Sequence, residues 1–278
     1  MSPPRRISDW AGFRLDRTLV MGILNVTPDS FSDGGRRTDP SDSIAAGLAM
    51  AADGADIVDV GGESTRPGAE MVPPEVEQAR VVPIIRALAG KGLCVSVDTR
   101  NASTMRAALT AGARIVNDVS ALVHDPRSAG VVAESGCPVV LMHMRGTPAT
   151  MAARALYEDI VAEVRAELSV RIESAVQVGV RPEQIAIDPG IGFAKRSAHS
   201  QGVLRGLPDL VSLGYPVLVG LSRKRFIGAL TKEPEAGRRL GGSLAAGLFA
   251  VLRGASILRV HDVRETVQAG SVWQTLFE

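Results

Sequence analysis

Short apolar runs alternate along the chain with longer segments in which apolar residues recur every three or four positions. Runs so short and so rich in Val and Ile predict strands that are buried on both faces, as in a parallel sheet covered by helices. The second run contains one charged residue, Asp59, and opens through Gly61-Gly62 into a polar loop. The predicted strands are residues 19–23, 57–60, 93–97, 114–116, 138–142, 185–187, 216–219 and 256–258.

The segments between these runs carry the apolar stripe of helices that pack on a core. Ser41 is the expected N-cap of the first helix, and Gly179 is the expected C-cap of the longest. Pro83 should bend or shorten the second helix, and Pro208 should interrupt the sixth. The predicted helices are residues 39–55, 74–88, 105–111, 131–134, 157–178, 203–213 and 240–252, with a last helix after residue 262.

Eight strands that alternate with eight helices predict an α/β fold, a (β/α)8 TIM barrel with parallel strands and outer helices. The barrel would be a single domain, residues 19–278, after an N-terminal lead-in, residues 1–18, that forms a short hairpin or an extension. A doubly wound open sheet is the alternative. The sequence favours the barrel because no glycine-rich dinucleotide fingerprint occurs and because polar residues follow every strand, whose ends a barrel gathers at one mouth.

The composition is that of an ordinary globular protein, with 278 residues, 45% hydrophobic and 22% charged. A net charge of +1 and an aromatic content of 4% provide neither a field nor a stacking surface for nucleic acid. No apolar run approaches the ~18 residues of a transmembrane helix, and the first residues lack the apolar core of a signal peptide. Two isolated cysteines form no disulfide framework. We therefore expect a soluble, cytoplasmic protein that binds neither nucleic acid nor membrane.

Polar residues follow every predicted strand, and most have a structural explanation when taken singly. Asp98 could cap a helix, Asn117 could serve a turn, and His143 could be a satisfied core histidine. Three cations at 223–225 oppose the dipole of the helix that they begin, which favours a bound anion there. Together the set is harder to dismiss, since one mouth would collect Asn25, Thr65, Arg66, Asp98, Asn117, His143, Asp188, Lys195, Ser222, Arg223, Lys224, Arg259 and His261.

The residue types in this set divide between two kinds of ligand. Asp98, Asn117 and Asp188 supply acceptors and one amide, the complement of a flat heterocycle rich in N–H groups, such as a 2-amino-4-oxo pteridine. The cations Arg66, Lys224 and Arg259, with His261, suit a polyanion, and loops seven and eight of such barrels are recurrent phosphate sites. The four histidines lack the spacing of a zinc site. A Mg²⁺ ion held mostly by diphosphate oxygens and by one protein oxygen, that of Asn25, is compatible with the set.

With these motifs in order, the sequence resembles dihydropteroate synthase from residue 20 to residue 267. The resemblance is carried by eight motifs, which together are highly specific: MGILNVTPDSFSDGG (21–35), VDVGGESTRPGA (58–69), VSVDT (95–99), VNDVS (116–120), MHMRGTP (142–148), IDPGIGFAK (187–195), LSRKRF (221–226) and RVHDV (259–263).

The resemblance implies an enzyme of folate synthesis that joins 6-hydroxymethyl-7,8-dihydropterin diphosphate to p-aminobenzoate, with Mg²⁺ and as a homodimer. The implied pterin contacts are Asp98, Asn117, Asp188, Lys224, Met142 and Gly220. The implied diphosphate contacts are Asn25, Thr65, Arg66, Arg259 and His261. The implied p-aminobenzoate contacts are Thr65, Arg66, Pro67, Phe193, Lys195 and Ser222. The implied chemistry is dissociative, so the central residues Asp98, Lys224, Arg259 and Asn25 act by positioning and by stabilising charge.

Three positions depart from what the resemblance leads us to expect, namely Ala152, Ser200 and Arg225. None is an implied pterin contact, although Arg225 could alter affinity for p-aminobenzoate or for sulfonamides that mimic it. Two alternatives share the Asp/Asn/Asp set: a pterin-dependent methyltransferase barrel and a pterin-binding paralogue without turnover. The methyltransferase has no evident need for the Asn25 loop, and the paralogue is expected to have lost Asn25, Arg66 or Lys224, all of which are present.

Overall fold

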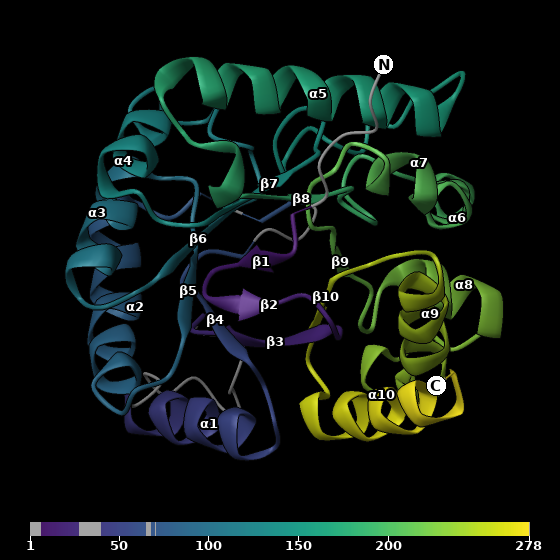
Figure 1. The fold of residues 1–278 in the computed structure, drawn as a ribbon, viewed down its shortest axis with the longest axis horizontal. Coiled ribbons are helices and arrows are strands. Elements are labelled where there is room, and N and C mark those ends of the chain that lie inside the picture. Colours follow the sequence, from purple (N-terminus) through teal and green to yellow (C-terminus); the bar gives the residue numbers. More distant parts are fainter. Residues whose placement is uncertain (1–6, 28–39, 65–67, 70, 278) are drawn as a thin grey trace.

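Eight parallel strands stand at the centre of the computed structural model, and helices surround them (Figure 1). Paired strands follow the order β8–β7–β6–β5–β4–β3–β10–β9, and a bridge between Ile187 and Val217 joins the two ends of this series. The predicted (β/α)8 barrel is therefore confirmed. The structure describes residues 7–27, 40–64, 68–69 and 71–277. The barrel strands are β3 (Leu19–Asn25), β4 (Ile57–Gly61), β5 (Val95–Asp98), β6 (Ile115–Asp118), β7 (Val139–Met142), β8 (Ile185–Asp188), β9 (Leu218–Gly220) and β10 (Ile257–Val260).

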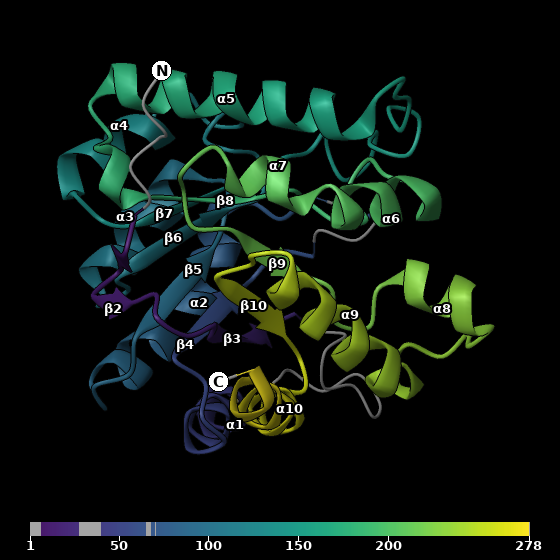
Figure 2. The same cartoon turned by 45° about the vertical axis from the view of Figure 1, so that its right-hand side comes forward.

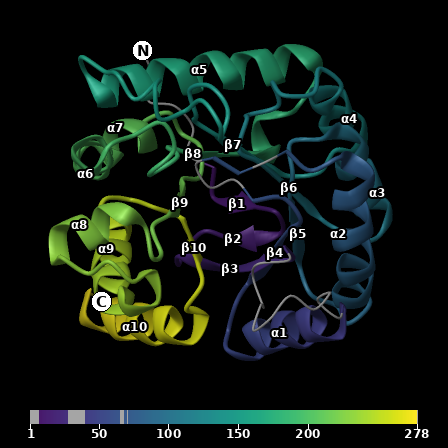
Figure 3. The ribbon, with the colours of Figure 1, turned by 180° about the vertical axis from the view of Figure 1, so that it is seen from behind.

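The helices form the outer layer. They lie around the strands when the molecule is seen from either end of its shortest axis (Figures 1 and 3). Their bounds are α1 (Pro40–Ala52), α2 (Pro74–Ala89), α3 (Ala102–Thr110), α4 (Ser128–Ser135), α5 (Ile160–Val178), α6 (Ser197–Arg205), α7 (Leu207–Val211), α8 (Arg225–Thr231), α9 (Leu240–Leu252) and α10 (Val263–Phe277). Two short 3₁₀ turns, Pro182–Gln184 and Ala236–Arg238, complete the helical segments. Helix α8 lies at one side of the molecule (Figure 2). In the described part of the chain, no helix has the length and apolar content needed to cross a membrane.

Three of the sequence predictions about helices can be compared with the observed elements α1, α2 and α5. Helix α5 begins after Asp159, whose carboxylate accepts from two backbone N–H groups, and it ends at Gly179 in the left-handed conformation, as predicted. Helix α1 begins at Pro40, so the prediction that Ser41 is its N-cap is wrong. Helix α2 continues through Pro83 for 16 residues, and the buried Ile84 and Ile85 anchor it to the core. Of the two predicted effects of Pro83, shortening is therefore wrong, and a bend stays a prediction.

The second predicted interruption is confirmed, since α6 and α7 meet at Gly206 and Pro208 lies in the first turn of α7. A Cβ atom at Gly206 would lie 2.5 Å from a methyl carbon of Val161 on α5. Glycine is therefore needed at this junction because the backbone of the bend packs directly on the neighbouring helix.

One apolar cluster fills the lower barrel interior, near the amino ends of the strands. We call this cluster the barrel floor. Trp10 closes it from below, with a side chain 1% exposed whose indole N–H donates to the carbonyl of Gln184 at 2.9 Å. Trp10 belongs to the antiparallel hairpin of β1 (Asp9–Trp10) and β2 (Phe13–Arg14), which confirms a hairpin in the lead-in. The barrel floor consists of Trp10, Leu19, Met21, Ile57, Cys94, Ile115, Val140, Ala186, Leu218 and Ile257.

Candidate functional site

Polar side chains replace apolar ones at the carboxyl end of the barrel interior. Alternate residues of a strand point to the same side, so a residue two positions beyond the barrel floor also faces the interior. On β6 this step leads from Ile115 to Asn117, and on β10 it leads from Ile257 to Arg259. The same step of two residues places Asp59, Met142, Asp188 and Gly220 inside, and Asn25 and Asp98 lie four residues beyond the floor on the same side of their strands. We call this set the barrel mouth: Asn25, Asp59, Asp98, Asn117, Met142, Asp188, Gly220 and Arg259.

Strand register brings several of these residues into one row across the mouth. Asn25 pairs with Gly61, Gly61 pairs with Asp98, and Asp98 pairs with Asn117. A Cβ atom at Gly61 would lie 3.6 Å from Oδ2 of Asp98 and 3.7 Å from Oδ1 of Asn25. The absence of a side chain at Gly61 therefore leaves a shared space between an amide oxygen and a carboxylate.

Arg259 links two carboxylates at the centre of the mouth. Its Nε lies 2.6 Å from Oδ2 of Asp59, and one terminal nitrogen lies 2.7 Å from Oδ2 of Asp98. Burial raises the pKa of Asp98, and the guanidinium of Arg259 opposes this rise. The alternative that Asp98 caps a helix is wrong, since α3 begins at Ala102 and the carboxylate bonds Arg259.

Asp59 is a site residue that the sequence reasoning left out of the candidate set. It lies inside β4 and is fully buried, and its Oδ2 also accepts from Nδ2 of Asn117 at 3.0 Å. Among the described residues its Oδ1 has no hydrogen-bond partner. The sequence did contain a signal for Asp59, because a charged residue in a strand that is buried on both faces requires a partner. That partner, Arg259, comes from the far end of the chain.

Asp188, at the end of β8, is a further acceptor of the mouth besides Asp59 and Asp98. Its Oδ1 accepts from the backbone N–H of Gly190 at 2.7 Å, and burial raises its pKa. The positive charges of Lys224, Arg259 and Lys195 oppose this rise. The charges of the mouth are therefore interleaved, with acidic and basic side chains facing one another around the interior.

Lys224 stands over an aromatic ring beside Asp188. Its Nζ lies 4.3 Å from the ring centroid of Phe193, which is a cation–π contact. Burial lowers the pKa of Lys224 to about 8, although the nearby charge of Asp188 raises it. Of the three cations at 223–225, Arg223 forms an ion pair with Asp262 and Arg225 is exposed, and the expectation that they serve a bound anion stays a prediction.

His261 and Ser222 join the loops after β10 and β9. The hydroxyl of Ser222 accepts from the backbone N–H of His261 at 3.2 Å and lies 3.1 Å from its Nδ1. Burial first, and then the positive charges of Arg223 and Arg259, lower the pKa of His261 to about 4. His261 is therefore neutral near pH 7 and would meet an anion as a hydrogen-bond donor rather than as a cation.

Lys195 lies in the loop after β8, only 7% exposed, and its Nζ bonds groups in the loops after β7 and β8. Its Nζ lies 2.7 Å from Nδ1 of His143 and 3.1 Å from the carbonyl oxygen of Phe193. His143 is therefore buried with both ring nitrogens hydrogen-bonded, which agrees with the structural explanation that the sequence allowed for it. Three further predicted residues, Thr65, Arg66 and Pro67, lie outside the described residues.

The three departures from the family pattern lie away from the central ion pairs. Ser200 is buried in α6, Ala152 is exposed in the loop before α5, and Arg225 is exposed at the first position of α8. Nothing in the structure explains the choice of these residues.

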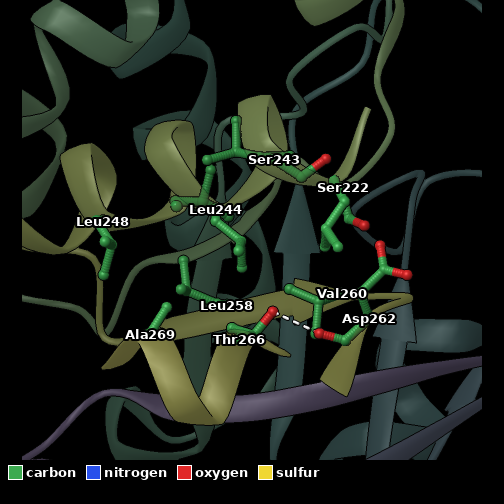
Figure 4. A pocket seen from close by; sticks show the side chains of 13 residues that line it. Ser222, Ser243, Leu244, Leu248, Leu258, Val260, Asp262, Thr266 and Ala269 are labelled. Atoms are coloured by element: carbon green, nitrogen blue, oxygen red, sulfur yellow. Dashed lines mark hydrogen bonds between the residues drawn. The ribbon is translucent and has the colours of Figure 1, made fainter. Parts of the chain in front are cut away.

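A small pocket lies behind the mouth, between β10, α9 and α10 (Figure 4). It is mostly apolar, with Leu244, Leu248 and Leu258 among its lining residues. Ser222 and Asp262 lie at one end of it (Figure 4). In this region Thr266 donates to the carbonyl of Asp262 at 2.7 Å and holds the loop after β10 on α10. The pocket therefore lies next to the loops after β9 and β10, which carry Ser222 and Asp262.

In the part of the chain that the structure describes, the mouth offers acceptors and cations but no activated nucleophile. No cluster of three or more His, Cys, Asp or Glu side chains able to hold a metal ion occurs among the described residues. Cys94 and Cys137 are free and buried away from this set. An arrangement of fixed charges without a nucleophile can bind a polar heterocycle and an anion and can stabilise charge that develops between them.

The barrel and its mouth define the class of protein, since residues 21–261 match the family described as "Pterin binding enzyme". A dihydropteroate synthase from Mycobacterium leprae is 51% identical over 257 residues, which cover 90% of this chain and 90% of that protein. Two structures of dihydropteroate synthase from Xanthomonas albilineans are also similar. The complex with 4-aminobenzoic acid has a TM-score of 0.90 at 49% identity, and the complex with 7,8-dihydropteroate has 0.87 at 47%; both pairings cover 99% of each chain. The chain belongs to the dihydropteroate synthase family.

Proposed function

We propose that this transferase joins 6-hydroxymethyl-7,8-dihydropterin diphosphate to p-aminobenzoate, giving 7,8-dihydropteroate and diphosphate in folate biosynthesis. The observation that carries the proposal is the barrel mouth itself. It combines the acceptors Asp98, Asn117 and Asp188 with the cations Lys224 and Arg259 in a site without a nucleophile. The similar structures that contain 4-aminobenzoic acid and 7,8-dihydropteroate support both substrates.

The pterin ring occupies the interior between the carboxylates. Asp188 and Asp98 accept from the amino and ring N–H groups, and Asn117 adds an amide that is already oriented by Asp59. Lys224 donates to the ring from beside Asp188. Met142, at the end of β7, provides an apolar contact, and Gly220, at the end of β9, leaves room for the ring because it has no side chain. Fixed acceptors of this kind favour a donor-rich ring because an unpaired donor in a closed site costs about 1–3 kcal/mol.

The diphosphate lies toward Asn25, Arg259 and His261, with Thr65 and Arg66 as further contacts. A Mg²⁺ ion fits this side, because Oδ1 of Asn25 is a hard oxygen ligand that shares the space over Gly61 with Oδ2 of Asp98. When bound, Mg²⁺ would be held mainly by diphosphate oxygens, and it would neutralise the charge of the leaving group. Arg259 adds a fixed positive charge at the same place, and its pKa lies above its usual range because Asp59 and Asp98 face it.

The reaction proceeds by departure of diphosphate before the aniline nitrogen attacks. The carboxylates of Asp98 and Asp188 face the pterin and stabilise the cation that forms on it, and Arg259 stabilises the departing anion. The p-aminobenzoate then enters beside Phe193 and Ser222, and Pro67 is a further expected contact. Its carbon–nitrogen bond forms as the amine loses a proton to solvent, so the protein contributes position and charge.

The proposal extends to the setting of the enzyme. A homodimer is the expected assembly by family analogy. The cytoplasm is the expected compartment, which agrees with two cysteines that are free and buried.

Release of diphosphate, measured with and without p-aminobenzoate, tests the proposed function. We expect steady release only when both substrates and Mg²⁺ are present, with one dihydropteroate formed for each diphosphate. Release that is equally fast without p-aminobenzoate, or binding of pterin with no release at all, would contradict the transferase assignment.

A further inference from the structure

A chain of four charged or polar side chains runs from beneath the mouth to helix α5. Nζ of Lys195 lies 2.7 Å from Nδ1 of His143, and Nε2 of His143 lies 3.1 Å from Oε2 of Glu167. The other oxygen of Glu167 accepts from Nε of Arg145 at 2.9 Å. The proposed reaction makes no use of this chain, although Lys195 and His143 are both buried, at 7% and 3% exposed.

The proton positions in this chain depend on the charge of Lys195, whose pKa burial lowers to about 7. In its ammonium form Lys195 can only donate, so Nδ1 of His143 then accepts from it and Nε2–H donates to Glu167. Burial lowers the pKa of His143 to about 4, which keeps the imidazole neutral near pH 7. Bonds from His143 and Arg145 lower the pKa of Glu167 to about 2, so a fixed negative charge closes the chain.

Lys195 ties two strand ends together through this chain. His143 follows β7, and its backbone N–H donates to the carbonyl of Asp188 at the end of β8 at 2.8 Å. The ammonium of Lys195 also donates to the carbonyl of Phe193 in the loop after β8, at 3.1 Å. One buried cation therefore links the end of β7 to the loop that carries the ring of Phe193.

The ring of Phe193 is in turn a wall of the mouth. Nζ of Lys224 lies 4.3 Å from its centroid, and a Cβ atom at Gly192 would lie 3.5 Å from Cδ of Lys224. A shift of the Phe193 carbonyl would move this ring relative to Lys224. Asp188 is held in place by bonds that do not involve Lys195. The backbone N–H of His143 donates to its carbonyl, and the backbone N–H of Gly190 donates to its carboxylate.

We infer that Lys195 is a positioning residue, which acts through His143 and Glu167 to hold Phe193 as the wall of the p-aminobenzoate subsite, and that it does not itself touch p-aminobenzoate. The inference rests on the proposed function and deepens it. It replaces the direct contact implied for Lys195 by the family resemblance with an indirect role. It also assigns a role to His143 and Glu167, which the sequence reasoning did not place in any subsite.

The test is a comparison of the two KM values in Lys195→Met, which keeps the length of the side chain and removes its charge. We expect the KM for p-aminobenzoate to rise by about tenfold or more, while the KM for the pterin diphosphate changes by less than about threefold. The matched control is Lys91→Met, the same change at an exposed lysine, which should leave both values unchanged. An equal rise in both KM values with a lowered Tm would mean a merely structural lysine and would overturn the inference.

Glu167→Gln keeps the test decisive if Lys195→Met fails to fold. The side chain of Glu167 is 39% exposed, and glutamine preserves its size while removing the charge that orients His143. We expect the KM for p-aminobenzoate to rise about threefold while the KM for the pterin diphosphate and the Tm stay nearly unchanged. The control Glu173→Gln, on the same helix, should change none of these values. Unchanged KM values in Glu167→Gln would overturn the inference. Wild-type enzyme without turnover would instead contradict the proposed function, so the two failures are distinguishable.

Discussion

The barrel floor and the barrel mouth are made by the same strands and face the same interior, yet they are opposite in chemistry. On β8 the step between them is from Ala186 to Asp188, and on β6 it is from Ile115 to Asn117. The floor is stabilised by burial of apolar surface, at roughly 25 cal/mol for each Å². The mouth buries carboxylates and cations, which cost free energy to desolvate and are tolerated because they face one another. Two residues along a strand therefore separate stability from function.

The largest effect is expected when the central cation of the mouth is removed. Arg259→Met leaves Asp59 and Asp98 without their partner, and breaking a buried ion pair from one side costs about 3–5 kcal/mol. We expect kcat/KM for the pterin diphosphate to fall at least about a hundredfold, together with a lower free energy of unfolding.

Steady-state kinetics and urea unfolding measure the two effects of Arg259→Met. Arg259→Lys, which keeps a charge but cannot bond both carboxylates, should lie between wild type and Arg259→Met. Normal kcat/KM in Arg259→Met would remove the arginine from the site.

A floor variant should separate stability from binding. Met21 is fully buried beneath the mouth, and Met21→Ala should lower the free energy of unfolding by about 2–5 kcal/mol because a cavity forms. The Kd of the pterin diphosphate should stay within about twofold at temperatures where the variant is folded, since no mouth residue is altered. Urea unfolding and calorimetry measure the two quantities. A tenfold weaker Kd would show that the floor and the mouth are not independent.

Removing one acceptor from the mouth should produce the reverse pattern. Asp188→Ala deprives the pterin N–H groups of an acceptor, which costs about 1–3 kcal/mol, and calorimetry should show a Kd weakened by about tenfold or more. Asp188→Asn keeps an oxygen for the Gly190 N–H and should weaken binding less. Wild-type affinity in Asp188→Ala would exclude Asp188 from the pterin site.

The smallest expected effect is a pH dependence that the floor cannot produce. Lys224 has its pKa lowered to about 8 by burial, so the ammonium is present below that pH and is lost as the pH rises through it. We expect kcat/KM for the pterin diphosphate to fall several-fold between about pH 7 and pH 9.5. In Lys224→Arg the fall should move to higher pH, because the guanidinium stays protonated. A profile that is identical in wild type and Lys224→Arg would assign the fall to another group.

The sequence was sufficient for the barrel because its strands are short apolar runs and its polar residues fall at strand ends. Period-two alternation also assigns Asn117, Asp188 and Arg259 to one interior. It could not reveal that Asp59 pairs with Arg259, since a contact across 200 residues depends on closure of the barrel. The inward direction of the Lys195 ammonium was likewise hidden, because a lysine after a strand is equally compatible with a mouth and with a buried bond.

The most direct test compares two variants of β6 that lie two residues apart on the same face, with calorimetric titration of the pterin diphosphate as the measurement. Ile115→Val, in the floor, should leave the Kd unchanged and lower the free energy of unfolding by about 0.5–1.5 kcal/mol. Asn117→Leu, in the mouth, should weaken the Kd by about tenfold or more because the ring loses its amide partner. Equal Kd values for the two variants would contradict the division of the barrel into a stabilising floor and a binding mouth.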